Sequence, residues 1–480
     1  MSTGINSDAH VGLRGVAAVW IMIFHAFIYS DAAIDLQGSS LMPLFFLFSG
    51  FSLTLSYKPS EGSNSFMSTS NIAFYQNRLA RTYPVYLLWT LLSIPLWIYG
   101  YGSGPPSGLI PSLIVSLLLI ATGVFFIFGG ALDGPGWTIC TLFIMWLFFP
   151  ISVSQLRSLS DAQIINQIIV CYWLQLALII ILFLPLLVLV GFEAAFFMST
   201  CNPWTRYPVF HMGIYAAELC LRAKDRPLKW PSIFLCFFPT SCCCQLDYFT
   251  AERNEEAEKR FWTKTADWNS VFLLLFTLSV TIGDAIYRYV PAQSLHTIFG
   301  GLWLQAIVPL AQLTVIVALV RDGGQSHASK LLLQPTLQWL GRISMSIYLI
   351  HFPIIYYLMW ANNDGNYVEW PKNYSCDATS TNRDDDYSNC RDNLSTFYSR
   401  LTLPYWLIPV VVVLTIPLSA ATFYLVEEPC RKAFRRSESP QQQHMRSRQA
   451  QSRSLEGDKQ SMLADGDEEL SVLNNMHEGK

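Results

Sequence analysis

The sequence predicts an all-helical integral membrane protein whose chain crosses the bilayer about ten times. Hydrophobic residues make up 52% of the 480 residues, charged residues make up only 14%, and the mean hydropathy is +0.33. A soluble domain usually has about 25% charged residues, so this composition excludes an ordinary soluble globule. The net charge of −3 carries no basic excess that would indicate a nucleic-acid partner. Membrane lipids are therefore the expected surroundings of most of the chain.

Long apolar runs recur along the chain, each about long enough for a helix that spans a hydrocarbon core. The 15 Trp and 22 Tyr residues lie in many cases near the ends of these runs, where they would anchor helices at the membrane interfaces. We expect spanning helices at residues 11–30, 41–57, 83–99, 109–130, 137–155, 164–192, 268–290, 298–320, 335–360 and 402–427. Together they form a multi-pass membrane domain over residues 11–430.

The distribution of basic residues predicts the orientation. The segment RKAFRR, residues 431–436, follows the last apolar run, so the positive-inside rule places the C-terminal tail in the cytosol. Counting back from the tail places residues 361–400 in the lumen or outside the cell and the basic loop at 222–264 in the cytosol. Counting forward from a cytosolic N-terminus at residues 1–10 gives the same sidedness for the early loops. An endomembrane or the plasma membrane fits this orientation.

The two counts agree only if residues 196–221 do not cross the membrane. A re-entrant or interfacial segment at this place would reconcile them, and an eleventh helix with another span misjudged is the alternative. Residues 437–480 are rich in Gln, Ser, Arg, Asp and Glu and poor in apolar residues, which is typical of a disordered cytosolic tail.

The polar segment at residues 361–400 has the features of an extracytoplasmic loop. It contains two glycosylation sequons, at Asn373 and Asn393. It also contains Cys376 and Cys390, whereas most of the other cysteines lie in or beside apolar segments, where a thiol behaves as a small hydrophobe. In an oxidising compartment we expect Cys376 and Cys390 to form a disulfide.

The first apolar run, LRGVAAVWIMIFHAF, carries a cation and a histidine at a spacing that places both on one face. Ten residues separate Arg14 from His25, so at about 100° per residue the two are rotated by only about 20°, and they stand roughly 16 Å apart along the axis. Charge in a spanning helix is costly and tends to be retained for function. Arg14 could hold an anionic carrier such as a CoA thioester while His25 accepts a proton from a hydroxyl group. The alternative is a topology-setting arginine and a histidine that joins two helices.

An ordered series of motifs resembles the acyltransferase-3 family of multi-pass, acyl-CoA-dependent O-acyltransferases over most of the chain. Each motif alone is weak, but their order is specific. The matches are Arg14 and His25; Phe45, Phe46, Ser49, Gly50 and Phe51 in FF-x-x-SGF; Arg78, Arg81, Pro84 and Tyr86 in R-x-x-R-x-x-P-x-Y; Ser344 or Ser346 with Tyr348, Leu349, His351 and Pro353; and Glu427 with Pro429. The W-[ST]-L element of the family is only approximated, by Trp137, Thr138 and Ile139.

The resemblance implies transfer of an acyl group, commonly acetyl, from acyl-CoA to a hydroxyl group of a glycan, lipid or small molecule. Such an enzyme belongs to the transferases of groups other than aminoacyl groups. It uses acyl-CoA as co-substrate and needs neither a tightly bound cofactor nor a metal. The resemblance makes His25 the catalytic base and Arg14 a donor-binding residue. Arg78 and Arg81 are three apart on one helical face and could bind the CoA phosphates, although membrane-anchoring arginines would look the same.

Further candidate site residues are Ser49, Trp137, Thr138, Tyr348 and His351. The family usually has a pair of glutamates a few residues after its W-[ST]-L element, whereas here Leu142 and Phe143 follow. Either those acids are dispensable, or Glu193, Glu218 or Asp284 replaces them, or activity is absent.

Two readings compete with an enzyme. A proton-coupled secondary transporter would also have about ten helices with buried His and Arg residues. A family member that binds acyl-CoA or lipid without turnover would explain the missing glutamates.

Overall fold

The computed structural model describes residues 7–32, 34–57, 69–101, 109–119, 134–190, 199–225, 255–287, 308–368 and 401–434. The chain divides into two units, Met1–Lys432 and Ala433–Lys480, and only residues 433 and 434 of the second are described. The tail at 437–480, most of the loop at 222–264 and most of the loop at 361–400 therefore lie outside the described residues. The two sequons and the two cysteines of the latter loop lie outside them as well.

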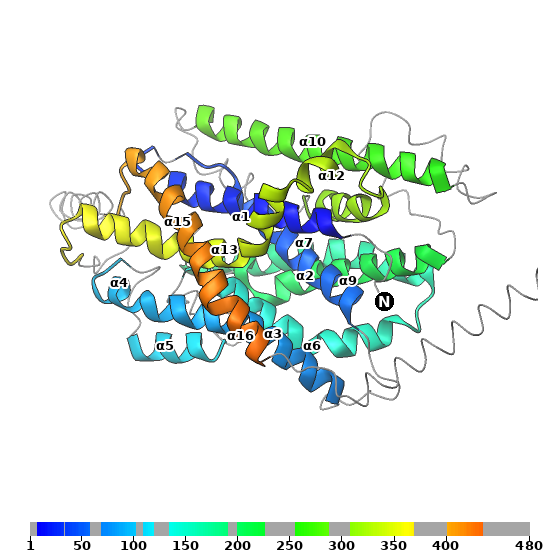
Figure 1. Ribbon diagram of the computed structural model, residues 1–480, viewed down its shortest axis with the longest axis horizontal. Coiled ribbons are helices and arrows are strands. Elements are labelled where there is room, and N and C mark those ends of the chain that lie inside the picture. Colours follow the sequence, from blue (N-terminus) through cyan, green and yellow to red (C-terminus); the bar gives the residue numbers. More distant parts are fainter. Residues whose placement is uncertain are drawn as a thin grey trace, which may run out of the picture. The chain divides into compact units, whose positions relative to one another are not determined.

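The described part of the chain is all-helical and has no strand, which confirms the predicted all-helical class. Most of its helices are labelled in Figure 1, and one apolar helix without a label spans Val308–Arg321. The labelled helices are α1 (Asp8–Ile28), α2 (Met42–Ser56), α3 (Thr69–Leu92), α4 (Ile94–Ile98), α5 (Leu109–Leu117), α6 (Gly136–Leu156), α7 (Asp161–Val190), α9 (Pro203–Asp225), α10 (Glu255–Tyr287), α12 (His327–Leu332), α13 (Pro335–Asn362), α15 (Ile408–Thr422) and α16 (Glu428–Phe434), with 3-10 turns η1 (Gly38–Leu41) and η4 (Tyr405–Leu407) and a π-helical turn η5 (Phe423–Glu427).

Among the described residues, seven helices are long and apolar enough to cross a membrane. They correspond to seven of the ten expected runs. The run at 83–99 is divided between α3 and α4, and neither helix is among the seven. The runs at 109–130 and 298–320 are described only in part, as α5 and the helix Val308–Arg321.

Residues 196–221, whose position the sequence left open, fall mainly in α9. This helix has 23 residues and is not among the seven candidate spans. Its middle is nevertheless buried, from Val209 to Cys220, with only Tyr215 and Glu218 partly exposed. It lies within the bundle beside α2 and α7 (Figure 1), so protein covers it on most sides.

Two glycines allow α1 and α13 to pack with their backbones in contact. A Cβ atom added at Gly15 would lie 2.6 Å from the Gly341 nitrogen, and one added at Gly341 would lie 1.9 Å from the Val11 carbonyl oxygen. Ten residues further along each helix, His25 contacts His351. Both contacts join residues 326 positions apart, so α1 and α13 run side by side in the same direction (Figure 1). Small residues at such crossings are typical of helix pairs in membranes.

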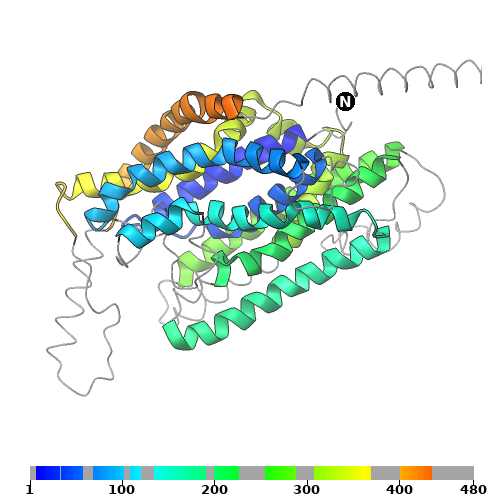
Figure 2. The ribbon, with the colours of Figure 1, turned by 90° about the horizontal axis from the view of Figure 1, so that it is seen from below.

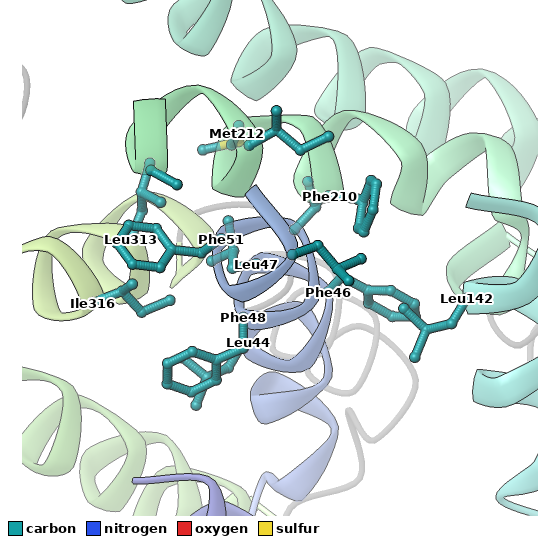
Figure 3. Packing of buried hydrophobic residues seen from close by; sticks show 14 of the residues in the cluster. Leu44, Phe46, Leu47, Phe48, Phe51, Leu142, Phe210, Met212, Leu313 and Ile316 are labelled. Carbon is teal, nitrogen blue, oxygen red and sulfur yellow. The ribbon is translucent and has the colours of Figure 1, made fainter. Parts of the chain in front are cut away.

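The same device joins α2 to α9, but there the helices run in opposite directions. A Cβ atom at Gly50 would lie 2.1 Å from the Phe210 carbonyl oxygen, and one at Gly213 would lie 2.2 Å from the Leu47 carbonyl oxygen. Figure 3 shows α2 enclosed by apolar side chains from α9, α6 and the helix Val308–Arg321. Gly50 of the SGF motif therefore has a packing role.

The ends of the bundle can be defined by the pair α1 and α13. At the end where α1 finishes, the Leu403 amide donates to the Tyr29 carbonyl (2.8 Å) and the Asp31 amide donates to the Leu403 carbonyl (3.0 Å). From there α15 runs back, and at the other end Glu427 meets Arg81 of α3. We call the end with Tyr29 and Leu403 the histidine end, and the end with Arg81 and Glu427 the arginine end. Figure 2 shows the long helices of this unit lying side by side from one end to the other.

Candidate active site

His25 of α1 and His351 of α13 form a directly bonded pair. The distance between His25 Nδ1 and His351 Nε2 is 3.0 Å, and the two rings are stacked with centroids 5.0 Å apart. His351 is fully buried, whereas His25 is partly exposed. The sequence singled out both histidines, but their contact depends on the α1–α13 crossing, which the sequence did not predict.

The hydrogen bonds of this pair assign its protons. His351 Nδ1 lies 3.1 Å from the carbonyl oxygen of Ile347, one turn earlier in α13. A carbonyl oxygen only accepts, so in a neutral His351 the proton is on Nδ1 and Nε2 is an acceptor. His25 Nδ1 must then donate to His351 Nε2. The lone pair of His25 therefore lies on its Nε2 atom, which is the nitrogen that can take a proton from another molecule.

Hydroxyl groups lie beside the histidine pair. Tyr348, one turn before His351 in α13, has its ring centroid 5.9 Å from that of His351. Its hydroxyl group is 2.6 Å from Thr138 Oγ1 of α6 and 3.8 Å from the sulfur of Met42. Tyr348 and Thr138 are both buried. The structure thus brings four sequence candidates, His25, His351, Tyr348 and Thr138, into one cluster.

The candidates Ser49 and Trp137 make packing contacts between helices. The Ser49 hydroxyl group accepts a hydrogen bond from Trp146 Nε1 (3.2 Å), which joins α2 to α6. The Trp137 ring lies against the ring of Phe46 with centroids 6.2 Å apart. In the described part of the chain, no contact joins Ser49 to the histidine pair.

Three arginines gather at the arginine end. Arg14 of α1 and Arg78 and Arg81 of α3 are close enough to repel one another electrostatically. Arg14 Nη2 donates to the Gly341 carbonyl oxygen (3.3 Å), and the Arg78 guanidinium lies 5.9 Å from the Phe74 ring centroid. Arg78 Nε is buried without a hydrogen-bond partner. Like charges that are held together in this way create a positive potential that attracts anions.

Glu427 is the carboxylate that faces this arginine cluster. Its Oε1 atom lies 3.5 Å from Arg81 Nε, and its Oε2 atom accepts a hydrogen bond from Ser346 Oγ of α13 (3.4 Å). Arg14 also attracts it electrostatically. The sequence marked Glu427 only as part of a closing motif, and its place beside the arginines is new.

A further arginine, which unlike the three clustered arginines is fully buried, escaped the sequence reasoning. Arg206 of α9 is only 1% exposed. It donates from Nε to the Thr200 carbonyl oxygen (2.5 Å), and its guanidinium lies 5.8 Å from the Phe46 ring centroid. A charge inside the apolar run at 196–221 was the signal that could have identified it.

The position of the family's missing glutamates is apolar in this structure. Leu142 is buried among the side chains that surround α2, as Figure 3 shows. Glu218 binds Arg222, which also binds Asp161 and the Leu159 carbonyl oxygen at the end of α6 opposite Thr138. Glu218 therefore does not replace an acid near Thr138. Glu193 and the Asp284 side chain lie outside the described residues.

Comparison with known proteins decides the family. A family model described as an acyltransferase domain, that of the acyltransferase-3 family, matches residues 11–424, which is nearly the whole chain. The chain belongs to the acyltransferase-3 family. No curated protein and no solved structure gives a significant match to it.

Membership of the acyltransferase-3 family makes the protein an acyltransferase, and the seven apolar helices make it an integral membrane protein. The matched range runs from the start of α1 into the π-helical turn, so it includes both halves of the histidine pair and all three clustered arginines. Helix α1 contributes one residue to each of the two groups, Arg14 to the arginines and His25 to the histidine pair.

Proposed function

We propose that the protein is a membrane O-acyltransferase that moves an acetyl group from acetyl-CoA to a hydroxyl group of a glycan, lipid or small molecule. The observation that carries this proposal is the His25–His351 pair, whose bonding leaves the His25 Nε2 lone pair available. A general base with these properties is what attack by a hydroxyl group on a thioester requires.

In the proposed reaction, His25 Nε2 removes the proton of the acceptor hydroxyl group as its oxygen attacks the thioester carbonyl carbon. The tetrahedral intermediate collapses, the carbon–sulfur bond breaks, and the proton passes from His25 to the departing CoA sulfur. His351 acts as a positioning residue, because its Nε2 atom holds His25 Nδ1–H and so fixes the ring and its tautomer. The Tyr348 hydroxyl group is the nearby candidate to donate to the developing oxyanion.

The donor is proposed to bind with its phosphates at the arginine end. Arg14, Arg78 and Arg81 offer guanidinium groups, which bind phosphate oxygens in pairs. The long pantetheine arm of CoA would then extend along α1 from the arginines toward His25, a separation of roughly 16 Å at 1.5 Å per residue. The unpartnered Arg78 Nε atom supports an anion at this place.

The membrane orientation is also a proposal. We infer that the arginine end faces the cytosol, that both termini are cytosolic and that the loop at 361–400 is extracytoplasmic. The parallel course of α1 and α13 supports this orientation, because both helices must then leave the cytosol in the same direction. About ten spans, with α3 and the partly described segments among them, complete the proposed topology.

Replacement of His25 by Ala tests the function without knowledge of the acceptor. Membranes from cells that express the full chain are incubated with acetyl-CoA labelled in the acetyl group, and label in the lipid and glycan fractions is measured. We expect a loss of about 10² to 10⁴-fold in label transfer, which is the usual contribution of a general base. Near wild-type transfer by this variant would refute the mechanism.

The matched control is His10→Gln. His10 is a second buried histidine of α1, but its Nε2 atom bonds the Ile316 carbonyl oxygen at the arginine end. A glutamine can keep that bond, so transfer by this variant should stay near the wild-type rate. The control separates a loss of chemistry from a general loss of folding in α1.

A binding protein without turnover is the second candidate, and the buried Leu142 at the position of the family's acids favours it. The same labelling experiment separates the two functions. Protection of the purified wild-type chain by CoA against thermal unfolding, together with no label transfer above His25→Ala, would support binding alone. A ligand at 100 times its Kd adds about 2.7 kcal/mol to stability, so protection is readily measured.

A further inference from the structure

A π-helical turn sets the direction of Glu427. Buried positions follow α15 at steps of four, at Val411, Thr415 and Ser419, and Glu427 continues the series. In an uninterrupted α-helix, Glu427 would be rotated about 160° from Val411, toward the opposite face. The π-helical turn Phe423–Glu427 takes up one extra residue, which reduces this rotation to about 60°. The turn therefore directs the carboxylate into the bundle.

The carboxylate that is directed inward in this way contacts two other helices. It is 1% exposed and lies between Arg81 of α3 and Ser346 of α13. Arg14 of α1 and Arg431 of α16 attract it electrostatically as well. π-helical turns are rare, and those that occur are frequently at functional sites. A π-helical turn that buries a charged side chain therefore points to a function for that side chain. Burial of a carboxylate is costly unless it is paired.

The contact with Arg81 has an informative geometry. Glu427 Oε1 faces Arg81 Nε at 3.5 Å. A guanidinium group has a second edge, formed by its two terminal nitrogens, and this edge binds phosphate oxygens in a bidentate manner. A carboxylate at Nε leaves that second edge available and fixes the plane of the group. Glu427 also offsets part of the repulsion between Arg81 and Arg14, which lowers the cost of holding them together.

We propose that Glu427 is a positioning residue of the donor site, which orients Arg81 so that its terminal nitrogens bind a phosphate of acyl-CoA. This inference rests on the proposed function, because it takes the arginine cluster as the donor site. Glu427 does not touch the acyl group. Its effect should therefore fall on donor affinity and KM and leave the turnover of bound donor unchanged.

The first test measures binding of CoA to the detergent-purified full chain by titration calorimetry. Glu427→Gln keeps the shape of the side chain and can still accept from Ser346, but it removes the charge that orients Arg81. We expect Kd to rise about tenfold, in the range for a hydrogen bond to a charged group. Glu427→Asp keeps the charge and should recover part of the affinity.

Glu428→Gln is the matched control. Glu428 is the next residue in the chain, and its carboxylate pairs with Arg431 and Lys432 and not with the arginine cluster. The control removes one negative charge from the same helix, so it corrects for any long-range effect of net charge. Its affinity for CoA should equal that of the wild type.

A double-mutant cycle shows whether Glu427 acts through Arg81. If it does, Arg81→Gln and Glu427→Gln are strongly non-additive, and the second change has little further effect on Kd once the first is present. A purely structural role of Glu427 predicts additive effects on Kd. It also predicts that Glu427→Gln lowers both kcat and the Tm of the ligand-free protein. The KM of acetyl-CoA in the labelling assay should rise in Glu427→Gln while kcat stays within about twofold.

The outcomes separate this inference from the proposed function. A wild-type chain that binds no CoA would overturn both. A wild type that binds CoA, with Glu427→Gln binding equally well or with additive effects in the cycle, would overturn the positioning role alone and leave the acyltransferase proposal intact.

Discussion

Two helix pairs in this protein are built with the same device and differ in what they carry. In both, glycines bring two backbones into contact, Gly15 and Gly341 between α1 and α13, and Gly50 and Gly213 between α2 and α9. The α2–α9 pair is antiparallel, and apolar side chains surround α2 (Figure 3). The α1–α13 pair is parallel and carries the bonded histidines.

The difference shows that close packing alone does not make a site. Each histidine lies ten residues beyond the glycine of its own helix, so the parallel course gives both the same distance from the crossing. An antiparallel pair would place two such side chains at opposite ends. In α1 and α13 the direction of the helices therefore brings the two histidines into contact.

Gly341→Ala and Gly213→Ala are matched substitutions, because each adds one Cβ atom at the crossing of one helix pair. The new Cβ would lie 1.9 Å from a carbonyl oxygen in the first case and 2.2 Å in the second, so both helix pairs must separate. Each variant should lose about 1–3 kcal/mol of stability, as overpacked sites do. Only Gly341→Ala moves the histidines, and a displacement near 1 Å can cost about 100-fold in rate.

The measurement is label transfer per folded molecule, with the folded fraction taken from size-exclusion profiles, beside the Tm of each variant. Equal rates per folded molecule for the two variants would contradict the idea that the α1–α13 crossing sets the active site.

His351→Phe sharpens the comparison by removing the polar contact and keeping a ring of similar size. His25 then loses its partner on α13 and keeps its backbone hydrogen bond with Ile21, so its ring is held less firmly. We expect kcat to fall about 10- to 100-fold, as it does when an orienting partner of a functional histidine is lost. His351→Gln can still offer an oxygen to His25 Nδ1–H and should retain more activity than the Phe variant. An inverse order of the two variants in steady-state kinetics would show that His351 does not act as an acceptor.

Tyr348→Phe should have the smallest effect. It removes one hydroxyl group next to the histidines, and a single hydrogen bond is worth about 0.5–1.5 kcal/mol, or about 2- to 12-fold in kcat. Tyr75→Phe is the control, because the Tyr75 hydroxyl group donates to the Leu147 carbonyl oxygen, nine residues beyond Thr138 in α6. If the two variants lower kcat equally, the Tyr348 hydroxyl group has no special part in the chemistry.

The sequence predicted the helical class and seven of the spans, and it singled out His25, Arg14, Arg78 and Arg81 as candidate site residues. Hydropathy and the 3.6-residue period are local properties, so they are readable from one chain. The contact between His25 and His351 could not be predicted from the sequence, because the two residues are 326 positions apart and the contact depends on the glycine crossing.

The role of Glu427 was hidden for another reason. A regular α-helix places this residue away from the arginines, and the sequence of α15 contains no signal that announces a π-helical turn. The burial of α9 was also missed, because its charged residues lower its hydropathy while neighbouring helices cover it. Tertiary packing decided both cases.

The separation between α1 and α13 has a consequence for how the protein is made. At about 5 to 20 residues per second, a ribosome takes roughly 16 to 65 s to synthesise the 326 residues between His25 and His351. For that interval α1 stands in the membrane with Arg14 and His25 and without the helix that satisfies them. A chain terminated before Pro335 therefore leaves Arg14 and His25 of its first helix permanently without this partner, at the cost of unpaired polar groups in the membrane.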